Sequence, residues 1–135
     1  MSELVLDTSA LMALLLQEPE AEGLLQVAAS AATLHLSAAT RLELSLVAEG
    51  TRTGTEPAEV DQLLLALGVA VVPFDQNQLH WALQGWRRFG KGRDRAGLNL
   101  GDCFSYGLAM ALEAPLLFKG SDFSSTDVAV AWTPG

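Results

Sequence analysis

A chain of 135 residues, half of them hydrophobic, is long enough to bury a core as one compact domain, which argues against a disordered protein. No apolar run reaches the roughly eighteen residues of a membrane span, and the single cysteine, Cys103, excludes an internal disulfide and a multi-cysteine zinc site. Sixteen acidic against eight basic residues give a net charge of −8, which argues against a simple nucleic-acid-coating module.

Short apolar runs alternate with amphipathic segments along the chain, a pattern typical of strands that alternate with helices. In chain order, we expect a strand at 4–6, helices at 10–16 and 20–29, a strand at 33–36, helices at 38–49 and 57–67, a strand at 69–72, a helix at 76–88, a loop at 90–99, a helix at 102–112, a strand at 116–118 and an edge strand at 128–132. This alternation predicts an α/β fold in which a central, mainly parallel sheet is flanked by helices on both faces. We expect residues 1–135 to form a single domain.

Acidic residues follow the predicted strands in a pattern that directs them to one edge of the sheet. Asp7 ends the first strand, and Asp122 lies just past the strand at 116–118. Asp102 opens the helix before that strand, and Glu43 lies about one turn into the helix after the second strand. Because ligand sites of parallel α/β sheets lie beyond the carboxyl ends of the strands, we expect these four acids to lie close together.

Such a group of carboxylates requires compensation of its charge. Two unit charges about 4 Å apart at an effective dielectric near 20 repel by about 4 kcal/mol, so the acids must take up protons or hold a cation. Oxygen ligands without imidazole or thiolate favour Mg²⁺ or Mn²⁺ over zinc. The expected chemistry is hydrolysis of a phosphate ester by a metal-activated water.

Each acid also has an ordinary structural interpretation. Asp102 would favour a helix N-terminus, Asp7 would cap the first helix, and Glu43 would pair with a nearby arginine. Glu43 is the hardest to interpret in this way, because the apolar residues Leu42, Leu44 and Leu46 surround it in the sequence and an unpaired buried carboxylate is costly. The spacing alone therefore leaves the function undecided.

Four segments of the chain form an ordered set: LVLDTSAL at 4–11, LSAATRLE at 36–43, LNLGDCFSY at 98–106, and PLLFKGSDF at 115–123 followed by TDV at 126–128. They resemble the motifs of PIN-domain proteins, and above all those of the VapC toxins of bacterial toxin–antitoxin pairs. The matches occur in the family's order, at family-like intervals, and cover most of the chain. The resemblance implies a single PIN-like nuclease domain that cleaves RNA with Mg²⁺ or Mn²⁺.

The resemblance also implies the site residues. The family's metal-binding and catalytic acids carry over onto four positions, Asp7, Glu43, Asp102 and Asp122. Ser9 matches a position that supports the site, and Asp127 matches an additional acid, which makes it a second-rank metal ligand. Ser121 stands where many relatives have asparagine, which puts no ligand in doubt.

Five of the eight basic residues are concentrated in one segment of this otherwise acidic chain: Arg87, Arg88, Lys91, Arg93 and Arg95. A carboxylate-lined site needs a positive surface nearby if it is to attract a polyanion. We therefore expect this segment to border the active site and to contact RNA phosphates rather than bases. The alternative is a solvated loop.

The resemblance implies protein partners as well as an RNA substrate. We expect a small cognate antitoxin, which would insert an arginine toward the acids, and a second copy of the chain in a homodimer. The chain has no positive charge before the apolar residues at 4–6, so we expect no signal peptide. A cytoplasmic protein without membrane association is the corresponding prediction.

Three alternatives to the nuclease remain: a phosphatase, a signalling domain and a non-catalytic binding protein. A haloacid-dehalogenase-like phosphatase needs a second acid two positions after the first, where this chain has Ser9. A receiver-type signalling domain uses adjacent acids near the first strand, whereas Asp7 directly follows an apolar pair. A non-catalytic interaction protein with the PIN fold would not need an intact set of four acids. A metal-dependent cleavage assay separates it from the nuclease.

Overall fold

The computed structural model describes residues 3–134, so residues 1, 2 and 135 of the predicted domain lie outside the described residues. Within that range, a four-stranded parallel sheet has the order β3-β2-β1-β4. Its strands are β1 (Glu3–Leu6), β2 (Thr33–Ser37), β3 (Val69–Val72) and β4 (Leu116–Leu117). Among the described helices, none combines the length and apolar composition needed to cross a bilayer.

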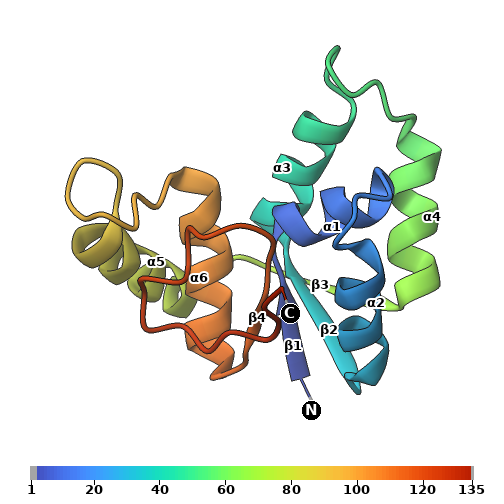
Figure 1. Cartoon of the computed structure of the whole chain (residues 1–135). Coiled ribbons are helices and arrows are strands. Elements are labelled where there is room, and N and C mark those ends of the chain that lie inside the picture. The colour runs from blue at the N-terminus through green and yellow to red at the C-terminus, as the bar shows by residue number, and fades with distance from the viewer. Residues whose placement is uncertain (1–2, 135) are drawn as a thin grey trace.

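Helices cover both faces of this sheet (Figure 1). One face is covered by α1 (Thr8–Leu15), α2 (Ala21–Ser30), α3 (Ala38–Ala48) and α4 (Pro57–Leu67). The other face is covered by α5 (Gln76–Phe89) and α6 (Leu100–Leu112). The predicted α/β fold with a parallel sheet between two helical layers is therefore confirmed.

The central strand β1 divides the hydrophobic core in two. Leu4 and Leu6 pack in the cluster formed with α1 to α4, whereas Val5 packs in the cluster formed with α5 and α6. Successive side chains of a strand point to opposite faces, and here both faces are covered. This explains why the strand is a continuous apolar run in the sequence rather than an alternating one.

The order of the strands creates a ligand-binding position next to β1. The chain passes from β1 to β2 and then to β3 on one side, while β4 pairs with β1 on the other side. The backbone N–H of Asp7 donates to the carbonyl of Leu117 at 3.0 Å, so the carboxyl ends of β1 and β4 are held together. In open α/β sheets, such a reversal of strand order is where ligands bind.

The prediction of an edge strand at 128–132 is wrong. Only an isolated bridge forms, between Val130 and Leu116. Leu116 donates to Ala129 O at 2.8 Å and accepts from Ala131 N at 3.0 Å. Because β4 is only two residues long, its outer edge offers the N–H and C=O of one residue, which is too few for a ladder.

Candidate active site

Asp7 is held through both oxygens of its carboxylate. Oδ2 accepts from the N–H of Ser9 at 3.0 Å and from its Oγ at 2.6 Å, and Oδ1 accepts from Oγ of Ser105 at 2.6 Å. Oγ of Ser9 in turn accepts from the backbone N–H of Lys119 at 3.0 Å, which joins the loop after β4 to this acid. Asp7 is the N-cap of α1, and it is 4% exposed. The capping interpretation is correct, but Ser105 orients the second oxygen from a different helix.

Glu43 extends from α3 toward the first turns of α1 and α6. Its Oε1 accepts a hydrogen bond from Oγ1 of Thr8, and its Oε2 occupies space that a side chain at position 101 would fill. A Cβ placed on Gly101 would lie 1.6 Å from that oxygen. Burial raises the pKa of Glu43, the hydrogen bond from Thr8 lowers it, and the charge of Asp7 raises it.

The apolar sequence around Glu43 explains only part of its burial. Leu44 is fully buried, but Leu42 is 62% exposed and Leu46 is 68% exposed, so two of these three apolar neighbours lie at the surface. The alternative of an arginine partner also lacks support at the nearest candidate, because Arg41 pairs with Asp61 at 2.9 Å. The contacts with α1 and α6 are what bury this carboxylate.

Asp102 lies in the first turn of α6, where it forms a reciprocal capping box with Asn99. The N–H of Asn99 donates to Oδ2 of Asp102 at 3.1 Å, and the N–H of Asp102 donates to Oδ1 of Asn99 at 2.9 Å. Burial raises the pKa of Asp102 to about 7, with further upward contributions from the charges of Asp7 and Asp122. Structural capping and electrostatic coupling to the other acids therefore coexist at this residue.

Asp122 is the most accessible member of the predicted set. It is exposed in the loop that follows β4. A side-chain hydrogen bond with Asp122 favours the protonated form of Asp102, which shows that the two carboxyl groups are neighbours. The interactions Asp7–Glu43, Asp7–Asp102 and Asp102–Asp122 thus link four acids from four segments into one continuous group.

The described residues contain no preformed three-ligand metal site. Between residues 3 and 134, no three His, Cys, Asp or Glu side chains have a spacing that could hold one ion. Both oxygens of Asp7, Oε1 of Glu43 and Oδ2 of Asp102 accept from hydroxyl or backbone donors instead. Shared coordination of a metal by these acids stays a prediction.

The chemistry of these side chains nevertheless suits a divalent cation. Burial is the largest cause of the raised pKa values of Asp102 and Glu43, and the charge of Asp7 raises both further, so a cation beside them would favour their ionised forms. Lys119 does not supply this positive charge, because its Nζ pairs with Glu18 at 3.0 Å and with Glu20 at 3.5 Å. Mg²⁺ prefers oxygen ligands and usually keeps several waters, so it requires only one or two carboxylates from the protein.

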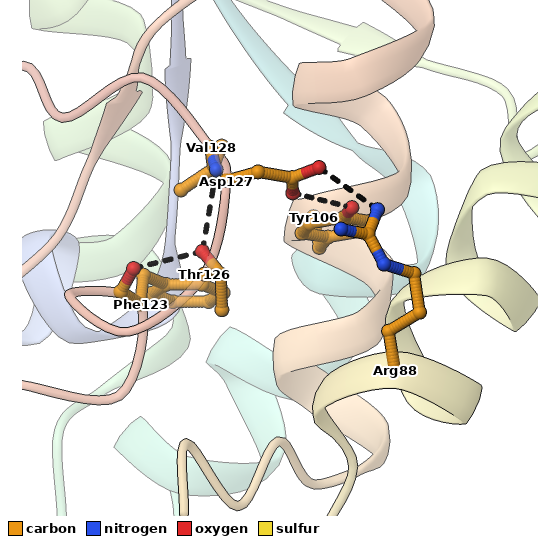
Figure 2. A network of polar contacts seen from close by, with 6 residues as sticks. All are labelled: Arg88, Tyr106, Phe123, Thr126, Asp127 and Val128. Atoms are coloured by element: carbon orange, nitrogen blue, oxygen red, sulfur yellow. Dashed lines mark hydrogen bonds and ion pairs between the residues drawn. The ribbon is translucent and has the colours of Figure 1, made fainter. Parts of the chain in front are cut away.

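Asp127, the second-rank candidate, has both carboxylate oxygens engaged in other contacts (Figure 2). Oδ1 accepts from the hydroxyl of Tyr106 at 2.7 Å, and Oδ2 accepts from Nη1 of Arg88 at 2.9 Å. A metal-binding role for Asp127 is not tested by this geometry and stays a prediction.

All five residues of the basic segment are exposed. Arg87 and Arg88 lie in the last turn of α5, and the other three lie in the loop 90–99 that leads into α6 (Figure 1). The guanidinium of Arg93 stacks over Trp86 at 4.0 Å, and that of Arg88 stacks over Phe89 at 4.7 Å. The segment therefore reaches the helix that carries Asp102, and RNA contact remains a prediction.

Sequence reasoning missed three residues that shape the site, namely Thr8, Gly101 and Ser105. A signal for Ser105 was present, because it follows Asp102 by three positions and therefore shares its helix face. Thr8 was visible only as part of the first motif. Nothing in the sequence connects Gly101 with Glu43, which lies on another helix.

An apolar groove borders the acids between α3 and α6. It has a volume of about 470 Å³, and Leu42, Leu46, Leu100 and Phe104 line it together with Glu43. Leu100 is 74% exposed, so this groove opens to the surface. A glutamate of the candidate site is thus in direct contact with an accessible apolar surface.

Comparisons with known proteins give a consistent assignment. Residues 4–129 match the model of the PIN domain. The ribonuclease VapC of Mycolicibacterium smegmatis is 47% identical, over 93% of this chain and 98% of the relative. Ribonuclease VapC30 of Mycobacterium tuberculosis is 46% identical, over 97% of this chain and 100% of the relative.

Solved structures agree on the fold at much lower identity. VapBC2 from Rickettsia felis, bound to a DNA fragment from its promoter, has a TM-score of 0.72 at 14% identity and covers 95% of this chain and 96% of that one. A toxin–antitoxin complex from Klebsiella pneumoniae has a TM-score of 0.67 at 18% identity and covers 95% of this chain and 97% of that one.

Proposed function

The chain belongs to the PIN domain family, and we propose that it is an endoribonuclease of the VapC type, the toxin of a toxin–antitoxin pair. The relatives named ribonuclease VapC match it over almost their whole length, which supports this activity. The observation that carries the proposal is the continuous group of Asp7, Glu43, Asp102 and Asp122 at the junction of β1 and β4.

These four acids are proposed to hold Mg²⁺ or Mn²⁺. When bound, such an ion offsets the charge of the scissile phosphate and supplies an activated water at neutral pH. The remaining residues orient the carboxylates. Ser9 and Ser105 hold Asp7, Asn99 holds Asp102, and the missing side chain at Gly101 leaves room for Glu43.

The proposed partners are a cognate antitoxin and a second copy of the chain. Solved relatives of the same fold are described as VapBC and toxin–antitoxin complexes, which supports an antitoxin partner. The groove beside Glu43 would receive apolar side chains of such a partner, because Leu42, Leu46 and Leu100 are largely exposed there. An RNA substrate and an antitoxin partner support a cytoplasmic location for the proposed activity.

The test is RNA cleavage by the purified full chain with Mg²⁺, with Mn²⁺ or with excess chelator. We expect cleavage with either ion, none with chelator, and loss of cleavage in Glu43→Gln. Glu49→Gln is the matched control, because Glu49 lies at the exposed end of the same helix. Full cleavage in chelator would contradict the metal mechanism, and absence of cleavage under every condition would favour a non-catalytic interaction protein.

A further inference from the structure

Asp122 lies in a segment without regular secondary structure. After β4, the chain from Lys119 to Val128 folds as consecutive turns, with Ser124 N donating to Ser121 O and Thr126 N donating to Phe123 O, both at 3.1 Å. Turns of this kind fix the local path of the chain but not its placement on the rest of the molecule. Contacts elsewhere in the loop must therefore determine where Asp122 lies.

One such contact is the buried side chain of Phe123. It is 1% exposed and packs edge-to-face on Phe118, with ring centroids 5.1 Å apart. Oγ1 of Thr126 donates to the carbonyl of Phe123 at 2.8 Å and accepts from the N–H of Val128 at 3.3 Å (Figure 2). Thr126 thus stabilises the turn through hydrogen bonds to a residue before Asp127 and to the residue after it.

Asp127 makes the second contact, and it reaches both helices of the layer formed by α5 and α6. Figure 2 shows its carboxylate between the hydroxyl of Tyr106 on α6 and the guanidinium of Arg88 on α5. The two distances are 2.7 Å and 2.9 Å. One carboxylate therefore joins the loop to both helices at once.

The helices are built to present these two groups. Tyr106 is fully buried, and its ring lies against Gly85 of α5, where an added Cβ would approach Cδ1 of the ring to 2.5 Å. The guanidinium of Arg88 rests on the ring of Phe89, which restricts its orientation. An isolated surface ion pair contributes little, but a carboxylate that also accepts from a buried hydroxyl is held much more firmly.

We propose that Tyr106, Asp127 and Arg88 form a latch that positions the loop 119–128, and with it Asp122, against Asp102. In this arrangement, Asp127 is a positioning residue and not a metal ligand. Arg88 is likewise a positioning residue, in contrast to Arg87 beside it, which has no such partner among the ion pairs of residues 3–134. The inference rests on the proposed function only where it assigns Asp122 to the nuclease site.

The first test measures amide hydrogen exchange in the metal-free full chain, so it does not depend on activity. Tyr106→Phe removes the hydroxyl and keeps the ring. We expect the amides of 119–128 to exchange about tenfold faster or more, as for the loss of a hydrogen bond to a charged group. Arg88→Ala has a similar effect, Arg88→Lys recovers part of the protection, and Arg87→Ala, the matched control, leaves exchange unchanged. The amides of β1 are the internal control for global destabilisation.

The second test separates positioning from metal binding. Asp127→Asn and Tyr106→Phe should lower kcat and the affinity for Mn²⁺ to a similar extent, because both displace Asp122, with KM changed by less than twofold. A loss of Mn²⁺ affinity in Asp127→Asn, with none in Tyr106→Phe, would make Asp127 a ligand and overturn the latch. Unchanged exchange of 119–128 in Tyr106→Phe would overturn it as well. If the wild type cleaves no RNA, the proposed function fails, while the exchange data still decide the latch.

Discussion

The two sides of the candidate site hold their acids in different ways. Asp7 and Asp102 are 4% and 8% exposed and lie at the ends of a strand and a helix, where Asp7 accepts from the buried Ser105 and Asp102 accepts from the backbone of Asn99. Asp122 is exposed in a loop of turns, and side-chain contacts such as those of Phe123 and Asp127 help to place that loop. The first side is therefore fixed by the fold itself, whereas the second depends on a few replaceable contacts.

The largest effect is expected at the buried side. Asp7→Asn removes the charge of the best-ordered carboxylate, and we expect a loss of kcat of about a thousandfold or more, since metal catalysis contributes several kcal/mol. The loss of kcat in Asp122→Asn should be at least tenfold smaller than in Asp7→Asn, because water screens an exposed charge from a bound cation. Both values come from single-turnover cleavage at saturating RNA. Equal losses of kcat in the two variants would contradict the expectation that the buried carboxylate contributes more than the exposed one.

A glycine on the buried side gives the next largest effect. Gly101→Ala forces the carboxylate of Glu43 from its position, so cleavage should fall about tenfold to a hundredfold, by the known cost of small misplacements in active sites. Thermal stability should not fall, because the flexible end of Glu43 can move aside and alanine favours helix by about 1 kcal/mol.

Gly107→Ala in the same helix is the matched control for this substitution. Its Cβ would lie 2.7 Å from the carbonyl oxygen of Gln78, which cannot move aside. It should therefore lower the melting temperature without changing the position of Glu43. A Gly101→Ala variant that cleaves RNA as the wild type does would show that Glu43 tolerates displacement.

Local sequence patterns predicted the buried side well and the loop side poorly. The strand expected at 4–6 lies within β1 (Glu3–Leu6), and Asp7 follows from the apolar run before it. The segment 128–132 has the composition of a strand, but the two-residue length of β4 prevents a ladder, and that length is not a local property of the segment.

The same limit applies to individual residues of the site. The motif marked Asp127 as an acid, but its partners Tyr106 and Arg88 lie 21 and 39 positions away in the sequence. The role of Gly101 likewise depends on Glu43 of another helix. Contacts between distant segments decide these roles, and the spacing of residues in one segment does not encode them.

The raised pKa of Asp102 predicts a pH dependence of stability in the metal-free protein. Between the ordinary value of 3.8 and the folded value of about 7, the folded protein binds more protons at this group than the unfolded chain does. The contribution of Asp102 to stability therefore decreases as pH rises through this range. Asp102→Asn has no carboxyl group to ionise, so it avoids this decrease in stability. The melting temperature of the variant minus that of the wild type should therefore be a few degrees larger at pH 8 than at pH 5.

Thermal unfolding in chelator at both pH values measures this difference. Saturating Mg²⁺ should reduce the difference in melting temperature between Asp102→Asn and wild type at pH 8, because the ion stabilises the ionised carboxylate of the wild type. The same melting-temperature difference at pH 5 and at pH 8 would contradict the raised pKa of Asp102.

The smallest effect is expected from the basic segment, of which Arg88 contacts the loop at Asp127. Arg87, Lys91 and Arg95 are exposed, and changing all three to alanine should weaken RNA binding and reduce its salt dependence by up to about one unit of slope per lost contact. Arg88 is left intact, because its removal would also open the latch at Asp127. A triple variant that binds RNA as the wild type does across a salt series would show that the segment is a solvated loop.

The most direct measurement is anomalous diffraction from crystals of the protein soaked in Mn²⁺. The acids at the junction of β1 and β4 are proposed to hold the ion, so the anomalous map should contain a peak with carboxylate oxygens of Asp7 and Asp102 at about 2.0–2.6 Å. The same soak of Asp7→Asn crystals should lose that peak. A wild-type map with no peak among these acids, from crystals whose loop and acids match the structure described above, would contradict the assignment of a metal-dependent nuclease site.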